Sequence, residues 1–78
     1  MSMNEVQKEM LFDILEDEGY SVVTDEPKFI LARKSKTEFY RIFIERKYMD
    51  CVRTSPGIID AANKLSYPEV LEFISTFN

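Results

Sequence analysis

The chain has 78 residues, a hydrophobic fraction of 45% and a formal net charge of −4 at pH 7. This length supports one hydrophobic core and excludes a second domain, so a single domain over residues 1–78 is expected. The sequence has no histidine, which removes the commonest general base and metal ligand, and its two glycines are too few for a phosphate-binding loop. We therefore expect a protein that is not an enzyme and binds no cofactor or metal.

The cysteine content and the apolar runs indicate a cellular location. Cys51 is the only cysteine, so no intramolecular disulfide can stabilise the fold. A lone cysteine is also more often a small buried hydrophobe than a nucleophile. No apolar run approaches the ~20 residues of a membrane span, and the first residues lack the basic start of a secretory signal. These features predict a cytoplasmic protein without membrane contact.

The first predicted element is a helix over residues 3–18. Ser2 and Glu5 have the S-x-x-E spacing of a capping box, and Gly19 has the place of a C-terminal cap. Apolar residues at helical spacing are expected to face the core. They are Met3, Val6, Met10, Leu11, Ile14 and Leu15.

Short runs rich in β-branched and aromatic residues then predict antiparallel strands. Residues 21–24 and 29–33 flank a proline-containing turn over residues 25–28. Residues 38–46 form the longest predicted strand, and residues 48–53 are a candidate fourth strand. The short connections favour antiparallel hairpins.

Two serine–proline segments divide the C-terminal part of the chain. Ser55-Pro56-Gly57 predicts a helix start, followed by a short helix over residues 58–65. The segment Ser66-Tyr67-Pro68-Glu69 repeats the S-x-x-E spacing and begins an amphipathic helix through Phe77. The predicted fold is therefore α+β: an N-terminal helix, a three- or four-stranded antiparallel sheet, and one or two C-terminal helices packed on one sheet face.

The charges are segregated along the chain. Residues 1–26 carry eight acidic side chains and one lysine, whereas residues 27–54 carry eight basic and three acidic side chains. Asp13, Glu16 and Asp17 lie near the C-terminal end of the first predicted helix, where the helix dipole disfavours each acid by ~0.3–1 kcal/mol. Two interpretations stay open: basic residues of the sheet or water neutralise these acids, or the acids bind a basic patch on a partner.

Phe12 is an apolar residue among acids. On a helical wheel it falls between Glu5, Glu9 and Glu16. Either another element of the fold covers Phe12, or the side chain is exposed and serves as a binding hot spot.

The strand over residues 38–46 alternates two kinds of side chain. Tyr40, Ile42 and Ile44 carry no formal charge and are expected to face the helices. The alternate side chains would then line the open sheet face; they are Phe39, Arg41, Phe43 and Glu45. These residues are either ordinary core filling or a contact surface for a second copy of the chain or another partner.

The leading hypothesis is a small protein–protein interaction module, such as an inhibitor or adaptor of the kind that phages and plasmids encode. Its candidate partner-binding residues are Phe12, Asp13, Glu16, Asp17, Phe39, Arg41 and Phe43. A homodimer is compatible with the small size of the chain. The alternative is a nucleic-acid-binding protein that uses the basic, aromatic strands of residues 28–53. The acidic overall composition counts against that alternative.

Overall fold

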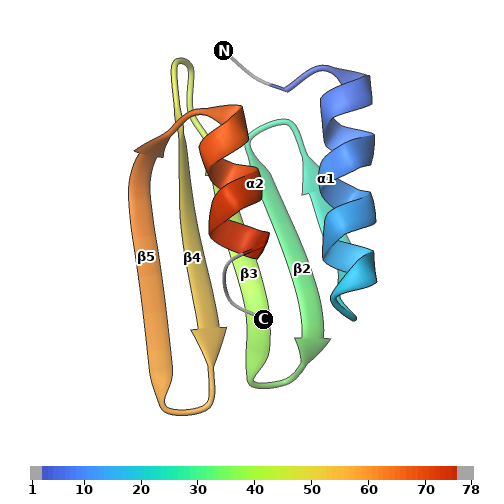
Figure 1. Ribbon diagram of the computed structural model, residues 1–78, viewed down its shortest axis with the longest axis vertical. Helices are drawn as coiled ribbons and strands as arrows, with labels where there is room; N and C mark the ends of the chain where they lie inside the picture. Colours follow the sequence, from blue (N-terminus) through green and yellow to red (C-terminus); the bar gives the residue numbers. More distant parts are fainter. Residues whose placement is uncertain (1–2, 76–78) are drawn as a thin grey trace.

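The computed structural model describes residues 3–75, which form a helix, five strands and a second helix (Figure 1). The helices are α1 (Glu5–Asp17) and α2 (Tyr67–Ser75). The strands are β1 (Ser21–Glu26), β2 (Phe29–Ser35), β3 (Glu38–Ile44), β4 (Met49–Ser55) and β5 (Ile58–Leu65). The predicted α+β class is confirmed, but the sheet has five strands, not three or four.

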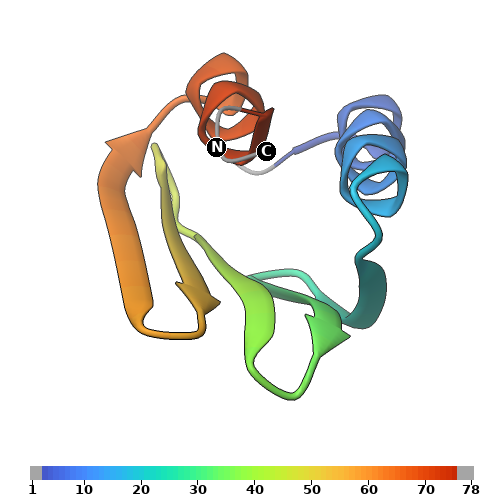
Figure 2. The same cartoon turned by 60° about the horizontal axis from the view of Figure 1, so that its bottom comes forward.

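The sheet is an antiparallel meander in which each strand pairs with its neighbour in the sequence. The sheet is curved, and Figure 2 shows both helices on its concave side. Helix α1 packs against β1, and α2 packs against β4 and β5. The opposite, convex face of the sheet has no helix over it in either view (Figures 1 and 2).

The helix predicted over residues 58–65 is wrong, because these residues form β5. Ser55 pairs with Ile58 across a two-residue turn made of Pro56 and Gly57. Gly57 has φ +77°, and proline followed by a residue with positive φ is typical of a type II turn. The proline therefore begins a hairpin at this point instead of a helix, and the chain returns along β4.

The ends of α1 are set by local hydrogen bonds. The Asn4 side chain accepts a bond of 2.8 Å from the Gln7 backbone N–H, and the Asn4 N–H donates to Gln7 Oε1 at 3.1 Å. The capping box is therefore Asn4 with Gln7; the predicted cap Ser2 lies outside the described residues. Gly19 ends the helix as predicted, with φ +91° and an N–H that donates to Glu16 O at 2.9 Å.

The apolar stripe of α1 is narrower than its sequence indicates. Leu11 and Leu15 are fully buried, but Val6 is 67% exposed and Met10 is 50% exposed. The prediction that Val6 and Met10 face the core is wrong. Since α1 packs mainly against α2 and the edge strand β1 among the described elements, only part of its apolar circumference is covered.

The core lies between the helices and the concave face of the sheet. Tyr20 and Tyr40 meet edge to face with ring centroids 4.9 Å apart. Cys51 is fully buried, and burial raises the pKa of its thiol to about 12, so the thiol stays protonated at neutral pH. The buried residues are Leu11, Leu15, Tyr20, Ile30, Ala32, Tyr40, Ile42, Ile44, Met49, Cys51, Val70 and Ile74.

Helix α2 begins where its capping pattern predicts. The Ser66 N–H donates to Glu69 Oε1 at 2.8 Å, and this bond lowers the pKa of Glu69. Val70 and Ile74 are fully buried, whereas the predicted core residue Phe77 lies outside the described residues. Neither helix within residues 3–75 has the length and apolar character needed to cross a membrane.

Candidate functional site

Strand β3 presents different side chains to the two faces of the sheet. Tyr40, Ile42 and Ile44 are 1%, 0% and 4% exposed, because they point toward the helices as predicted. The alternate residues Phe39 and Arg41 are half-buried and point to the convex side, as does Phe43 (continuing the same alternation).

Neighbouring strands extend this convex surface, which we call the outer face. Across β2 and β3, Phe29 pairs with Phe43, and their ring centroids are 5.2 Å apart. Arg41 pairs with Leu31 of β2 on one side and with Val52 of β4 on the other. We define the outer face by six half-buried residues: Phe29, Leu31, Phe39, Arg41, Phe43 and Val52.

Half of these residues were missed by the sequence analysis. Phe29 and Leu31 alternate with the buried Ile30 and Ala32, so the period of two in β2 indicates their direction. Val52 follows Cys51 in the same way. The signal was present, but it needed the strand register to show that these side chains surround Arg41.

Arg41 is the cation at the centre of the outer face. Its guanidinium carbon lies 5.9 Å from the centroid of the Phe39 ring, within the range of a cation–π contact. Its Nε is buried and has no hydrogen-bond partner, and the guanidinium forms no salt bridge within residues 3–75. A buried donor without an acceptor carries a desolvation cost, which a carboxylate from outside the chain would offset.

The other charges near the outer face lie at its margins. Asp50 is opposite Phe43, but its Oδ1 accepts the Lys64 N–H at 2.9 Å and so holds the irregular end of β5, where Lys64 has φ +57°. Arg33 is exposed and pairs with Phe39, whereas Glu26 pairs with Phe29 at the other end.

The acidic residues of α1 lie on the helix side of the molecule. Asp13, Glu16 and Asp17 are exposed and form no salt bridge within the described part of the chain. The nearby sheet lysine, Lys34, passes beside Gly19 and places its Nζ 5.8 Å from the Tyr20 ring centroid instead. No basic side chain of the described part of the sheet therefore forms a salt bridge with these three carboxylates.

Phe12 is half-buried and packs against the core cluster. This contact favours the interpretation that the fold covers Phe12. The exposed apolar side chains of α1 are instead Val6 and Met10, on a different side of the helix.

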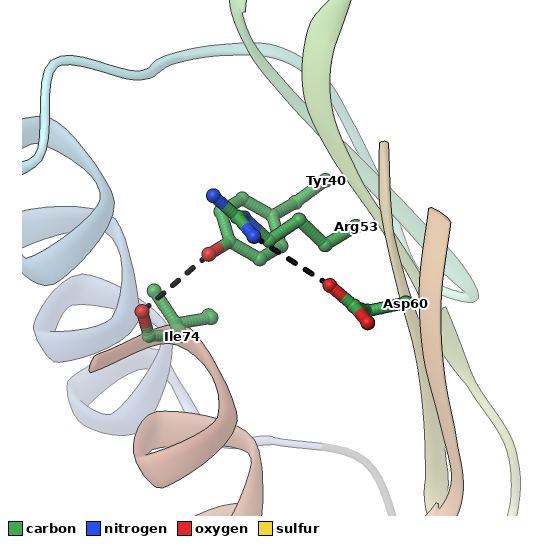
Figure 3. Close-up of polar contacts among 4 residues, drawn as sticks. All are labelled: Tyr40, Arg53, Asp60 and Ile74. Atoms are coloured by element: carbon green, nitrogen blue, oxygen red, sulfur yellow. Dashed lines mark hydrogen bonds and ion pairs between the residues drawn. The ribbon is translucent and has the colours of Figure 1, made fainter. Parts of the chain in front are cut away.

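Polar contacts on the concave side tie secondary-structure elements together (Figure 3). The Tyr40 hydroxyl donates to Ile74 O at 3.4 Å, and Arg53 Nη1 lies 3.6 Å from Asp60 Oδ2. Burial raises the pKa of Tyr40 to about 12, against the opposing effect of the Arg53 cation. Tyr40 therefore stays protonated at neutral pH, and these contacts connect β3 to α2 and β4 to β5.

Sites for small ligands or metals are not evident within residues 3–75. Two cavities beside Met3 have volumes of about 130 and 200 Å³, below the ~300–1,000 Å³ that is typical of small-molecule sites. No cluster of three or more His, Cys, Asp or Glu side chains within these residues could hold a metal ion.

Comparison with known proteins adds no relative: no protein-family model, curated protein or solved structure matches the chain. The outer face and the exposed side of α1 are the candidate binding surfaces among the described residues. Of the residues proposed from the sequence, the structure brings Phe39, Arg41 and Phe43 together on one surface and places Asp13, Glu16 and Asp17 on another.

Proposed function

We propose that this protein is a small non-enzymatic binding module, an inhibitor or adaptor, that docks another protein on the outer face of its sheet. The observation that carries the proposal is the position of Arg41: a cation without a counter-ion among residues 3–75, surrounded by apolar side chains on the sheet face that neither α1 nor α2 covers.

The residue types of the outer face match those of protein interfaces. Aromatic residues and arginine are enriched at the centres of interfaces, where a ring of surrounding contacts excludes water from the central residue. Phe39 and Phe43 flank Arg41 along β3, while Leu31 and Val52 flank it across the sheet. A partner that covers this ring would desolvate the guanidinium, so it must also supply an acceptor.

The partner is therefore expected to offer an apolar surface that carries a carboxylate. The distance along β3 from Phe39 to Phe43 is about 14 Å, and three strands span about 10 Å. A single helix or extended segment of a protein covers such an area. A small molecule has too little surface to cover the ring and still meet Arg41.

Nucleic acid is the second candidate ligand, because phenylalanine rings beside arginine can stack bases. The basic residues do not follow the aromatic ones, however. Of the basic side chains between residues 28 and 53, Arg33 and Arg41 belong to the outer face and its margin. Arg53 lies on the concave side with Asp60, and the others lie near the strand ends. The basic side chains therefore form no continuous track for phosphates on the described outer face, and the apolar ring supports protein binding better than nucleic-acid binding.

A photo-crosslinker tests the proposal in the cells that encode the protein. We would place p-benzoylphenylalanine at position 39 and compare it with the same group at position 72, an exposed residue of α2. We expect a discrete protein adduct from position 39 alone, and its loss when Arg41→Met removes the charge but keeps the apolar stem. Adducts that are the same from both positions, or that survive Arg41→Met, would contradict the proposal; crosslinked RNA or DNA would support the alternative.

A further inference from the structure

The exposed side of α1 combines apolar side chains with carboxylates, as expected of a partner for the outer face. Val6 is 67% exposed and Met10 is 50% exposed, and the exposed Asp13 and Asp17 follow at helical spacing. Residues separated by three or four positions share one face of a helix. These four residues therefore form one outward stripe, the α1 stripe, which is apolar in its first half and acidic in its second half.

The outer face has the same division along its length. Phe29 and Phe43 form its apolar end, while Arg41 lies two residues further along β3. Arg33, which pairs with Phe39, lies a further two residues along and extends the basic end. The basic residues of the sheet thus lie beyond Phe29 and Phe43, as the acidic residues of the helix lie beyond Met10, and Phe39 adds an apolar side chain beside Arg33.

We propose that the partner on the outer face is a second copy of this chain, whose α1 stripe lies along β3; this inference rests on the proposed function. With Met10 of one copy against Phe43 of the other, Asp13 comes opposite Arg41 and Asp17 comes toward Arg33. Met10 to Asp17 spans about 10 Å on a helix and Phe43 to Phe39 spans about 14 Å on a strand, so the long arginine side chains must cover a difference of about 4 Å.

The acids of the outer face do not oppose this arrangement. Glu26 and Asp50 both lie in line with Phe29 and Phe43, at the apolar end. They are therefore furthest from the position of Asp17 in the docked helix. Glu26 is exposed at the edge strand, and Asp50 already accepts the Lys64 N–H.

The geometry requires a head-to-tail contact. The α1 stripe belongs to the helix layer, and the outer face is on the other side of the sheet, so one copy cannot join its own two surfaces (Figure 2). Each contact leaves one free α1 stripe and one free outer face, and such heterologous contacts produce open chains. A two-fold contact between outer faces is disfavoured because it brings one Arg41 against the other.

The contact is expected to be weak and sensitive to salt. Helix α1 has 13 residues, so it is about 20 Å long and buries less than the ~1,200 Å² of a standard interface. Self-association should therefore depend on protein concentration in the micromolar to millimolar range. Added salt should reduce it, because ~1 M salt shortens the screening length to about 3 Å.

Sedimentation of complementary variants tests the inference. We expect the oligomers of the wild-type chain to become larger as the protein concentration rises. Asp13→Lys and Arg41→Glu should each abolish this growth. Asp13→Lys keeps an intact outer face and Arg41→Glu keeps an intact α1 stripe, so their mixture should form oligomers in which the two variants alternate, because both kinds of contact then join opposite charges. The double variant that carries both substitutions should recover oligomers through the exchanged charges. The control Glu72→Lys changes the net charge as much as Asp13→Lys does, but on α2, and it should behave as the wild type.

Two results would overturn the inference. One is a wild-type chain that stays monomeric at millimolar concentration; the other is a mixture of Asp13→Lys and Arg41→Glu that forms no mixed oligomer. Cooperative unfolding of both variants establishes that they are folded. If the chain is monomeric but position 39 crosslinks a different protein, this inference fails while the proposed function stands.

Discussion

The two faces of the sheet are made by the same strands but differ in what covers them. On the concave face, Tyr40 and Ile42 are sealed beneath the helices, and no charged side chain is buried among residues 3–75. On the convex face, Phe39 and Phe43 are half-buried around Arg41, and α1 and α2 both lie on the other side of the sheet (Figure 2). Adjacent residues of β3 thus have opposite surroundings, although their backbone conformation is the same.

Both faces of the sheet carry apolar side chains, but the two described helices cover only the concave face. Helices α1 and α2 have 13 and 9 residues, and both lie on the concave side. An apolar face that stays uncovered in the monomer is a common feature of binding surfaces. The concave face accordingly holds the buried core, and the outer face is the surface to which we assign the proposed binding.

The largest effect is expected from Ile42→Ala on the concave face. Ile42 is fully buried, so removal of its side chain leaves a cavity in the core. The free energy of unfolding should fall by about 2–5 kcal/mol. Urea denaturation measures this change, and a loss close to zero would contradict the assignment of this face to the core.

Alkaline pH should destabilise the buried core on the concave face. Burial raises the pKa of Tyr40 and of Cys51 to about 12, above their ordinary values of 10.0 and 9.0. The folded state thus favours the protonated groups, so their contribution is intact below about pH 9 and is lost as pH rises toward 12. Stability measured by urea denaturation should fall across this range, and less so in Tyr40→Phe and Cys51→Ala. A fall in both variants that is as large as in the wild type would contradict this account.

Phe43→Ala on the outer face should cost less than Ile42→Ala. Phe43 is half-buried and loses its contact with the Phe29 ring, so the expected loss is about 1–2 kcal/mol. The same denaturation series measures both variants. A loss for Phe43→Ala as large as that for Ile42→Ala would remove the distinction between the two faces.

Arg41→Met should have the smallest effect on the monomer. In the described part of the chain the guanidinium has no counter-ion and its Nε has no hydrogen-bond partner, so little stabilising energy is lost and a desolvation cost is removed. We expect a change within about 0.5 kcal/mol of the wild type in thermal unfolding. A strong destabilisation would show that Arg41 has a structural role, and the binding proposal would lose its main support.

Strand alternation and helix capping could be predicted from the sequence because they depend on neighbouring residues. The period of two in β3 placed Tyr40 and Arg41 on the correct faces, and Ser66 with Glu69 marked the start of α2. Local patterns failed where the same residues serve two structures: Pro56 suits the first turn of a helix and also a hairpin turn.

Other features depend on tertiary arrangement and could not be predicted locally. Val6 and Met10 continue an apolar helical stripe, but the position of α1 at the edge of the sheet leaves them exposed. Likewise, the setting of Arg41 among Leu31 and Val52 requires the register of three strands. These are also the positions on which the binding proposals depend.

Phe43→Glu gives the most direct test of the difference between the two faces. The variant would be unfolded in urea and, in the same preparation, crosslinked from p-benzoylphenylalanine at position 39. We expect a cooperative unfolding transition, because the outer face is not needed for the fold, together with complete loss of the protein adduct. A chain that is unfolded without urea would show that Phe43 belongs to the core, and a folded chain that keeps its adduct would show that binding occurs elsewhere.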